Sequence, residues 1–288
     1  MSELSHTFFR WTSAQARQYI QATIRKKKIC IVNFVYFAQA MKFKIYEENE
    51  VKIDKIWDII NNKELIPNYY KEALLNSDLL CIDGIAMQIF DWVWQFFFWG
   101  KRKRSDNLNG TDFLPYILEQ TKNQKVWIIM SSVYDPKLNK WPEWMDKGLN
   151  KLQQIYPHIT TIFKYQTEFS KRGEEFPFKE LQETLKKTEN HYDYRILLNG
   201  IGWPVQEIRT NHHKKELSDY NLIILNNGAT IDYYSWFETR APKRIIKLRV
   251  GETLWRVITQ PKKNIKKFLA MFGIVEYWRY LIKKVVKK

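Results

Sequence analysis

Two stretches of this chain place polar residues and glycines directly behind short apolar runs. Residues 79–82 are apolar and are followed by Asp83 and Gly84, and residues 195–198 are followed by Asn-Gly-Ile-Gly at 199–202. Each apolar run predicts a buried strand. A carboxylate at the end of a strand is a candidate general base that removes a proton from a hydroxyl group. From the residues alone, an ordinary turn carboxylate is the favoured interpretation of Asp83.

The second stretch predicts one β-α-β unit. Pro204, with Glu207 behind it, predicts the first turn of a helix that extends through Leu217, and the apolar run 222–225 predicts the next strand. Open α/β sheets bind ligands beyond the carboxyl ends of their strands. Backbone N–H groups at the start of the helix favour an anion, for example a diphosphate. Gly-rich turns are common in α/β domains, so the turn alone leaves an ordinary structural role open.

Composition limits the class of partner. The 288 residues include 45% hydrophobic and 16% aromatic side chains, enough for a sizeable core, and the formal net charge is +16. This charge implies a polyanionic partner: nucleic acid, an anionic membrane surface or a phosphorylated ligand. An RNP-type strand, a GXXG loop and a zinc pattern are all missing from the sequence, so a nucleic-acid-binding protein is the weaker alternative.

Cysteine usage and hydropathy indicate the compartment. Cys30 and Cys81 each lie in an apolar run, which predicts buried thiols rather than a disulfide. Residues 1–17 are polar and lack the apolar core of a signal peptide. No window reaches 18 apolar residues without charges, so we expect no spanning helix. These features predict a cytosolic protein, whatever surface it contacts.

Predicted strands alternate with predicted helices along the chain. This alternation predicts a Rossmann-like α/β fold, with a mainly parallel sheet covered by helices on both faces. We expect a catalytic core over residues 1–242 and a basic helical appendage over 243–288. The further expected strands are 29–37, 125–130 and 160–164, and the further expected helices are Ser13–Arg25, 47–71, a helix starting at 109–112, 144–156, Phe178–Lys187 and 244–258.

Two segments have the composition of membrane-surface elements. Residues 85–99 have helical length and many aromatic side chains; their polar residues Gln88, Asp91 and Gln95 form one narrow stripe, and Lys-Arg-Lys-Arg follows at 101–104. Both a core helix and a lipid-facing helix fit this pattern. Residues 261–288 are strongly basic with apolar residues at helical spacing, which predicts a helix on a membrane surface or one docked on the core.

The order of residues from position 202 onward carries a family resemblance. The sequence has Gly-x-Pro-x-Gln-Glu at Gly202–Glu207, Gly-x-x-x-Asp at Gly228–Asp232, and Arg-Ala-Pro at 240–242. In this order the chain resembles the WecG/TagA/CpsF glycosyltransferases (glycosyltransferase family 26). The Asp-Gly pair of that family's second strand matches Asp83-Gly84, and its first-strand asparagine matches Asn33. The resemblance spans roughly residues 29–280.

The resemblance implies an inverting transferase that moves a sugar from a UDP-sugar to a polyprenyl-diphosphate-linked acceptor for a surface polysaccharide. It implies that Asp83 is the catalytic base and that arginines of the appendage, rather than a metal ion or another cofactor, complete the site. Arg256 is the leading appendage arginine and Arg249 the second. We leave a homo-oligomer open. The residues expected to bind substrate are Asn33, Gly84, Gly202, Gln206, Glu207, Gly228, Asp232, Arg240, Arg249 and Arg256.

Three positions depart from the family pattern. Ile31 stands where the family has threonine, Asn107 where it has arginine, and Trp236 where it has glycine. These departures keep a second interpretation open, in which the chain is a catalytically silent family member that acts as a scaffold at the membrane.

Overall fold

The computed structural model describes residues 12–26, 28–36, 66–84, 87–92, 95, 106, 108, 110–134, 143–168, 178–227, 230–234, 242, 255, 258–259 and 261. Most of the appendage expected over 243–288 therefore lies outside the described residues, as do the expected strand end at Phe37 and the expected helical residues 47–65. The two cysteines are buried free thiols, as the sequence predicts.

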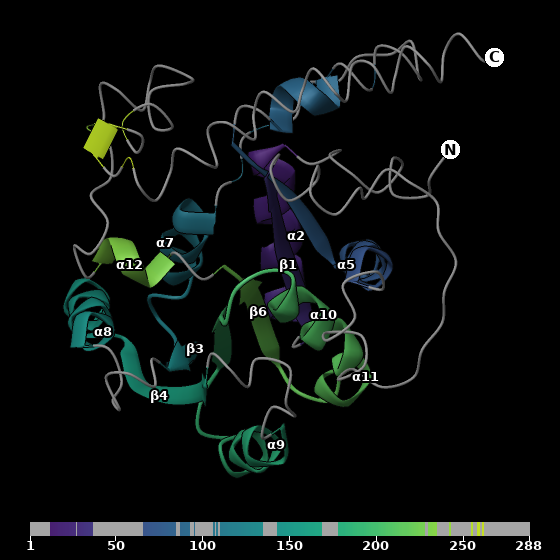
Figure 1. The fold of residues 1–288 in the computed structure, drawn as a ribbon. Helices are drawn as coiled ribbons and strands as arrows, with labels where there is room; N and C mark the ends of the chain where they lie inside the picture. Colours follow the sequence, from purple (N-terminus) through teal and green to yellow (C-terminus); the bar gives the residue numbers. More distant parts are fainter. Residues whose placement is uncertain are drawn as a thin grey trace, which may run out of the picture.

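All six described strands form one parallel sheet, in the order β2-β1-β6-β5-β3-β4. The sheet and its flanking helices are shown in Figure 1. This confirms the predicted Rossmann-like α/β architecture. The strands are β1 (Cys30–Tyr36), β2 (Leu79–Asp83), β3 (Val126–Tyr134), β4 (Ile159–Glu168), β5 (Tyr194–Gly200) and β6 (Leu222–Asn226).

Helices cover both faces of the sheet, because successive side chains of a strand point to opposite faces and here both sets are apolar. One core joins the sheet to α2 (Ser13–Arg25), α7 (Gly110–Gln120), α8 (Glu143–Ile155) and α12 (Thr230–Tyr234). The opposite core joins it to α9 (Phe178–Lys187) and α11 (Lys214–Leu217). On that side α10 (Val205–His212) also packs against α5 (Ile66–Leu75).

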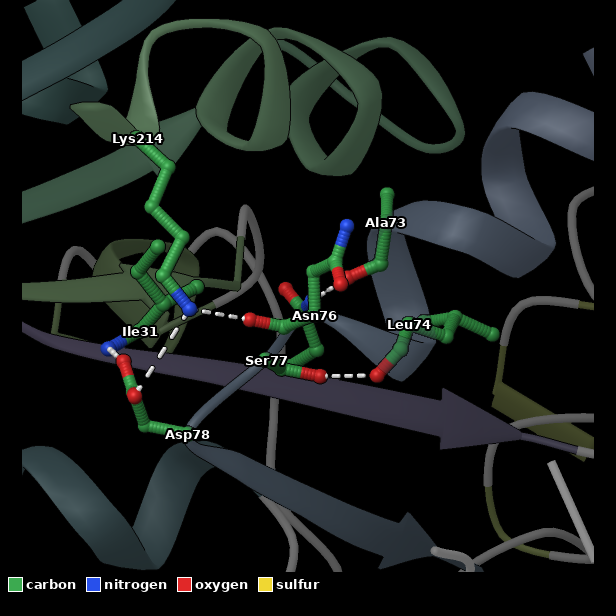
Figure 2. A network of polar contacts seen from close by, with 8 residues as sticks. Ile31, Ala73, Leu74, Asn76, Ser77, Asp78 and Lys214 are labelled. Atoms are coloured by element: carbon green, nitrogen blue, oxygen red, sulfur yellow. Dashed lines mark hydrogen bonds and ion pairs between the residues drawn. The ribbon is translucent and has the colours of Figure 1, made fainter. Parts of the chain in front are cut away.

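A carboxylate aligns the edge strand β2 with β1. Asp78 precedes β2, and its Oδ2 accepts a 2.8 Å hydrogen bond from the backbone N–H of Ile31, while its own N–H donates to the Ile31 carbonyl at 3.0 Å. Lys214 reaches across from α11, with its Nζ 3.7 Å from Asp78 Oδ1 and also bonded to the Asn76 carbonyl (Figure 2). These contacts lie directly before the parallel pairing of β1 with β2, in which Asp83 is the register partner of Tyr36.

Two helices differ from the sequence prediction. The single helix expected from Pro204 to Leu217 is interrupted at His213, whose backbone N–H donates back to Arg209 while its ring stacks on Phe178 at a centroid distance of 4.0 Å. Stacking of this ring on α9 provides a physical reason for the interruption. The helix expected to end at Lys71 runs to Leu75, and the short helix α12 was not predicted.

Candidate active site

The carboxyl ends of the parallel strands meet at one edge of the sheet and bring the candidate residues together. Asp83 is the last residue of β2 and pairs with Tyr36 of β1. Asn33 of β1 pairs with Leu80 on one side and with Asn226, the last residue of β6, on the other. Asp83 and Asn226 thus lie on strands that flank β1, and these strands are roughly 10 Å apart across the sheet. Asn226 is level with Leu80, so Asp83 also lies three residues, or roughly 10 Å, further along the strand direction.

Asp83 lies at the rim of this edge. Its side chain is half-buried, and Gly84 behind it has φ of +87°, a left-handed conformation that glycine adopts without strain. The Gly84 carbonyl accepts from the N–H of Gln88, so the chain turns directly into a helix. The Ile82 carbonyl accepts a 2.8 Å bond from the N–H of Leu108, which returns the following segment to the same strand end.

A chain of buried amides lies beneath this rim. Asn33 is 1% exposed; its Nδ2 donates to the Ala73 carbonyl at 3.3 Å, and its Oδ1 accepts from Asn226 Nδ2 at 2.6 Å. A backbone carbonyl can only accept, so it determines the orientation of Asn33, and Asn33 in turn determines that of Asn226. Asn226 Oδ1 then accepts from Asn199 Nδ2 and from Thr210 Oγ1, each at 3.1 Å.

The glutamine of the glycine-rich turn is part of the same network. Gln206 Oε1 accepts from the N–H of Gly202 at 3.2 Å, and its Nε2 donates to Glu207 Oε1 at 2.9 Å and to the Asn226 carbonyl at 3.0 Å. Gly202 has φ of +93° and the Trp203–Pro204 peptide is cis. Gln206 is buried, so its amide holds the turn between β5 and α10 against the end of β6.

Glu207 is a buried carboxyl group with an unusual charge state. It is 1% exposed, and burial raises its pKa to about 7, with the hydrogen bond from Gln206 acting in the opposite direction. Its Oε2 has no hydrogen-bond partner among the described residues. A buried carboxylate oxygen without a partner favours the protonated form, so this group is partly neutral at physiological pH.

The N-terminus of α7 lies near the end of β6, on the face of the sheet opposite to α10. Gly110 is buried, and a Cβ placed on it would lie 1.8 Å from Asn227 Nδ2, so a larger residue would require the Asn227 side chain to move. Asn227 Nδ2 donates to Thr230 Oγ1 at 2.6 Å, at the first residue of α12. The N-termini of α7 and α10 thus lie at the edge where Asp83 ends β2.

The site therefore has a rim and a floor. Half-buried Asp83, Gly84 and Gly202 form the rim, and the buried side chains of Asn33, Gln206 and Glu207 lie below it. Asp232 lies in α12, which begins four residues after β6 ends, and its side chain is outside the described residues. Gly228, Arg240, Arg249 and Arg256 are also outside them.

Sequence reasoning missed three members of the floor: Asn199, Thr210 and Asn226. Asn199 follows three apolar residues of its strand and Asn226 follows four. This was the available signal, because a polar residue at such a position must find partners when buried. Asn199 also lines a cavity of about 20 Å³, enough for about one water molecule, together with Thr210 and His213.

None of the helices in the described part of the chain is both long and apolar enough to cross a membrane. Within the same residues, no group of three or more histidine, cysteine, aspartate or glutamate side chains is arranged to hold a metal ion.

An all-parallel sheet with a carboxylate and glycine turns at its carboxyl edge defines a Rossmann-like α/β protein, a class in which ligands bind at that edge. Residues 64–288 match the family model described as the glycosyl transferase WecG/TagA/CpsF family, and the chain belongs to this family. Membership makes it a glycosyltransferase of cell-surface polymer biosynthesis. No curated protein matches the chain.

Proposed function

We propose that this chain is an inverting glycosyltransferase that uses a UDP-sugar donor and a polyprenyl-diphosphate-linked saccharide acceptor at the cytoplasmic face of the membrane. The observation that carries the proposal is the position of Asp83, a half-buried carboxyl group at the carboxyl end of a parallel strand in a chain of this family. A general base must remain accessible to its substrate, and Asp83 meets this requirement.

In the proposed reaction, an Asp83 carboxylate oxygen removes the proton from the acceptor hydroxyl group. The hydroxyl oxygen attacks the anomeric carbon of the sugar from the face opposite the diphosphate. The bond between that carbon and the diphosphate oxygen breaks, so the anomeric configuration inverts and UDP leaves with the bonding electron pair. The new glycosidic bond forms as the proton passes to Asp83.

The departing diphosphate needs positive charge, because stabilising the leaving group lowers the barrier. We assign this role to Arg249 and Arg256, which the family resemblance nominates and which lie outside the described residues. The N-termini of α7 and α10 at the same edge add partial positive charge from their backbone N–H groups. In this proposal the reaction requires no metal ion.

The buried network supports the rim rather than the chemistry. Gln206 ties the Gly202 turn to β6, and Asn226 ties β6 to Asn33 of β1. A reacting group displaced by about 1 Å can lose two orders of magnitude in rate, so rigid support has catalytic value. We propose that Asn33 and Gln206 keep the donor pocket in shape from below.

The test is a transfer assay with a panel of UDP-sugars and a polyprenyl-diphosphate-linked saccharide in detergent. At least one UDP-sugar should raise the midpoint of thermal unfolding and yield both UDP and an elongated lipid product, with undiminished rate in EDTA. Binding without product for every donor would favour the scaffold interpretation. No thermal shift with any UDP-sugar would refute the proposed donor class.

A further inference from the structure

One oxygen atom of the buried floor has no partner among the residues that the structure describes. Asn199 is 5% exposed, and its Nδ2 donates to the Gln206 carbonyl at 3.4 Å and to Asn226 Oδ1 at 3.1 Å. A backbone carbonyl only accepts, so this amide cannot be turned round. Asn199 Oδ1 is therefore directed away from these bonds and is buried without a donor. A buried acceptor left unpaired destabilises the fold, so this atom calls for a partner.

A second such atom belongs to His213, at the interruption between α10 and α11. Its Nδ1 is buried and has no hydrogen-bond partner in the described part of the chain. The ring stacks on Phe178 of α9 with the two planes 11° apart, which fixes the directions of both ring nitrogens. His213 as a whole is only partly buried, so its buried nitrogen lies on the inner side of the ring. Burial lowers its pKa to about 4, so the ring is neutral at physiological pH.

Asn199 and His213 line the same cavity. The cavity has a volume of about 20 Å³, and its walls include Leu181 of α9, Leu197 of β5 and Leu217 of α11. An ordered water molecule needs a cavity of about 10–15 Å³ or more and at least two polar partners. Water can donate to an oxygen and can donate to or accept from a ring nitrogen, whichever form the neutral ring takes. One water molecule therefore fits both the volume and the two buried atoms.

We propose that this cavity is a binding site for one water molecule, which donates to Asn199 Oδ1 and is hydrogen-bonded to His213 Nδ1. The water completes the network of the floor and joins it to the junction of α10 with α11 and, through the stacked ring, to α9. His213 is then a positioning residue, because it acts on the floor through the water rather than through contact with a substrate. The inference goes beyond the proposed function and does not depend on it.

A crystal structure of the wild-type chain, at a resolution that shows ordered water, tests the site directly. We expect a water peak at about 2.7–3.2 Å from both Asn199 Oδ1 and His213 Nδ1. The variant His213→Phe keeps a ring to stack on Phe178 but has no nitrogen, and we expect the peak to be absent from its structure. A dry cavity in the wild type, a water bonded to only one of the two atoms, or an unchanged peak in the variant would each overturn the proposal.

Stability measurements test the same link in solution. Asn199→Ala is introduced into the wild type, into His213→Phe and into His213→Asn, and the loss of stability that it causes is measured by urea denaturation. Asparagine gives up the ring but keeps a polar atom near the position of Nδ1. We expect the loss caused by Asn199→Ala to be roughly half as large in His213→Phe as in the wild type, and unchanged in His213→Asn.

The matched control is Asn33→Ala in the same three backgrounds. Asn33 belongs to the floor but is not among the residues that line the cavity, so its loss should be the same in all three. Equal losses from Asn199→Ala in the wild type and in His213→Phe would overturn the proposal. A loss reduced equally in both His213 variants would assign the coupling to the ring rather than to the nitrogen, and would overturn it as well.

Discussion

Asn226 Nδ2 donates a hydrogen bond to Asn33 Oδ1 at 2.6 Å and joins the last residue of β6 to the middle of β1. Both side chains are buried, and 193 residues separate them in the chain. Asn226 also accepts from Asn199 and Thr210, so one side chain links three neighbouring strands and α10. These bonds fix the relative positions of the strands, and Asn199 Oδ1 is the one oxygen of the three asparagines without a partner among the described residues.

Replacing Asn226 with Leu should therefore destabilise the protein strongly. The substitution leaves Asn33 Oδ1 without a donor, whereas Asn199 Nδ2 and Thr210 Oγ1 lose one acceptor and keep their bonds to the Gln206 carbonyl. One buried group that stays unpaired costs about 1–3 kcal/mol, so we expect a loss of about 1–3 kcal/mol in the free energy of unfolding, measured by urea denaturation. The control is Asn221→Leu, which removes one exposed bond to the Asp193 carbonyl and should cost under about 1 kcal/mol. Equal losses would contradict the proposed network.

Replacing Glu207 with Gln should stabilise the protein at alkaline pH. Burial raises the pKa of Glu207 from 4.5 to about 7, so the folded state binds the proton more tightly than the unfolded state. The contribution of protonated Glu207 to stability is fully present below about pH 4.5 and is lost as the pH rises through about 7. Gln still accepts from Gln206 and carries no charge. We expect the free energy of unfolding of the variant, measured by urea denaturation, to exceed that of the wild type by about 2 kcal/mol at pH 8 and by little at pH 5. A difference in stability that is the same at both pH values would refute this role of Glu207.

His213 should give the opposite pH dependence. Burial lowers its pKa from 6.5 to about 4, with the neighbouring His212 acting in the same direction. The unfolded state then binds the proton more tightly, so stability is lost as the pH falls from about 6.5 to about 4. His213→Phe keeps a ring to stack on Phe178 and has no proton to bind. Urea denaturation at pH 7 and pH 5 should show a smaller acid loss in the variant than in the wild type, by on the order of 2 kcal/mol. The same loss of stability from pH 7 to pH 5 in both proteins would contradict this role of His213.

Gly110→Ala should disturb the chain that follows β6. The added Cβ would lie 1.8 Å from Asn227 Nδ2 and 2.4 Å from its Cγ, so the side chain must move and break its bond to Thr230. We expect a loss of about 1–3 kcal/mol in stability, as for other overpacked sites. Asn227→Ala in the same chain should recover part of this loss, which a double-mutant cycle measures. Purely additive effects would show that the two positions do not meet.

Much of the fold was predictable because its signals are local. The apolar runs of β2, β5 and β6 end at aspartate or asparagine. The helix Phe178–Lys187 has the predicted bounds because charged and apolar residues alternate at helical spacing. The interruption at His213 was not predictable, because it depends on stacking against Phe178, which precedes it by 35 residues in the chain. Tertiary contacts of this kind override the local pattern.

The candidate site was only partly predictable for a related reason. Strand ends nominate Asp83 and Gly202, and the family resemblance nominates Asn33, which lies in the middle of β1. The structure brings the ends of β1, β2 and β6 to one edge. The sequence does not distinguish a rim residue from a buried one, and Gln206 is buried with both amide atoms bonded to the protein. That distinction follows from which strands are neighbours, and β6 becomes the neighbour of β1 only in the folded sheet.

The most direct test of the account compares the wild type with Asp83→Asn. Sugar transfer to the lipid-linked acceptor and binding of UDP are both measured, the first by product formation and the second by thermal shift. Asn keeps the shape of the side chain but cannot accept the proton, so transfer should fall by at least about 10²-fold while UDP still raises the unfolding midpoint. Transfer at the wild-type rate by Asp83→Asn would contradict the central claim.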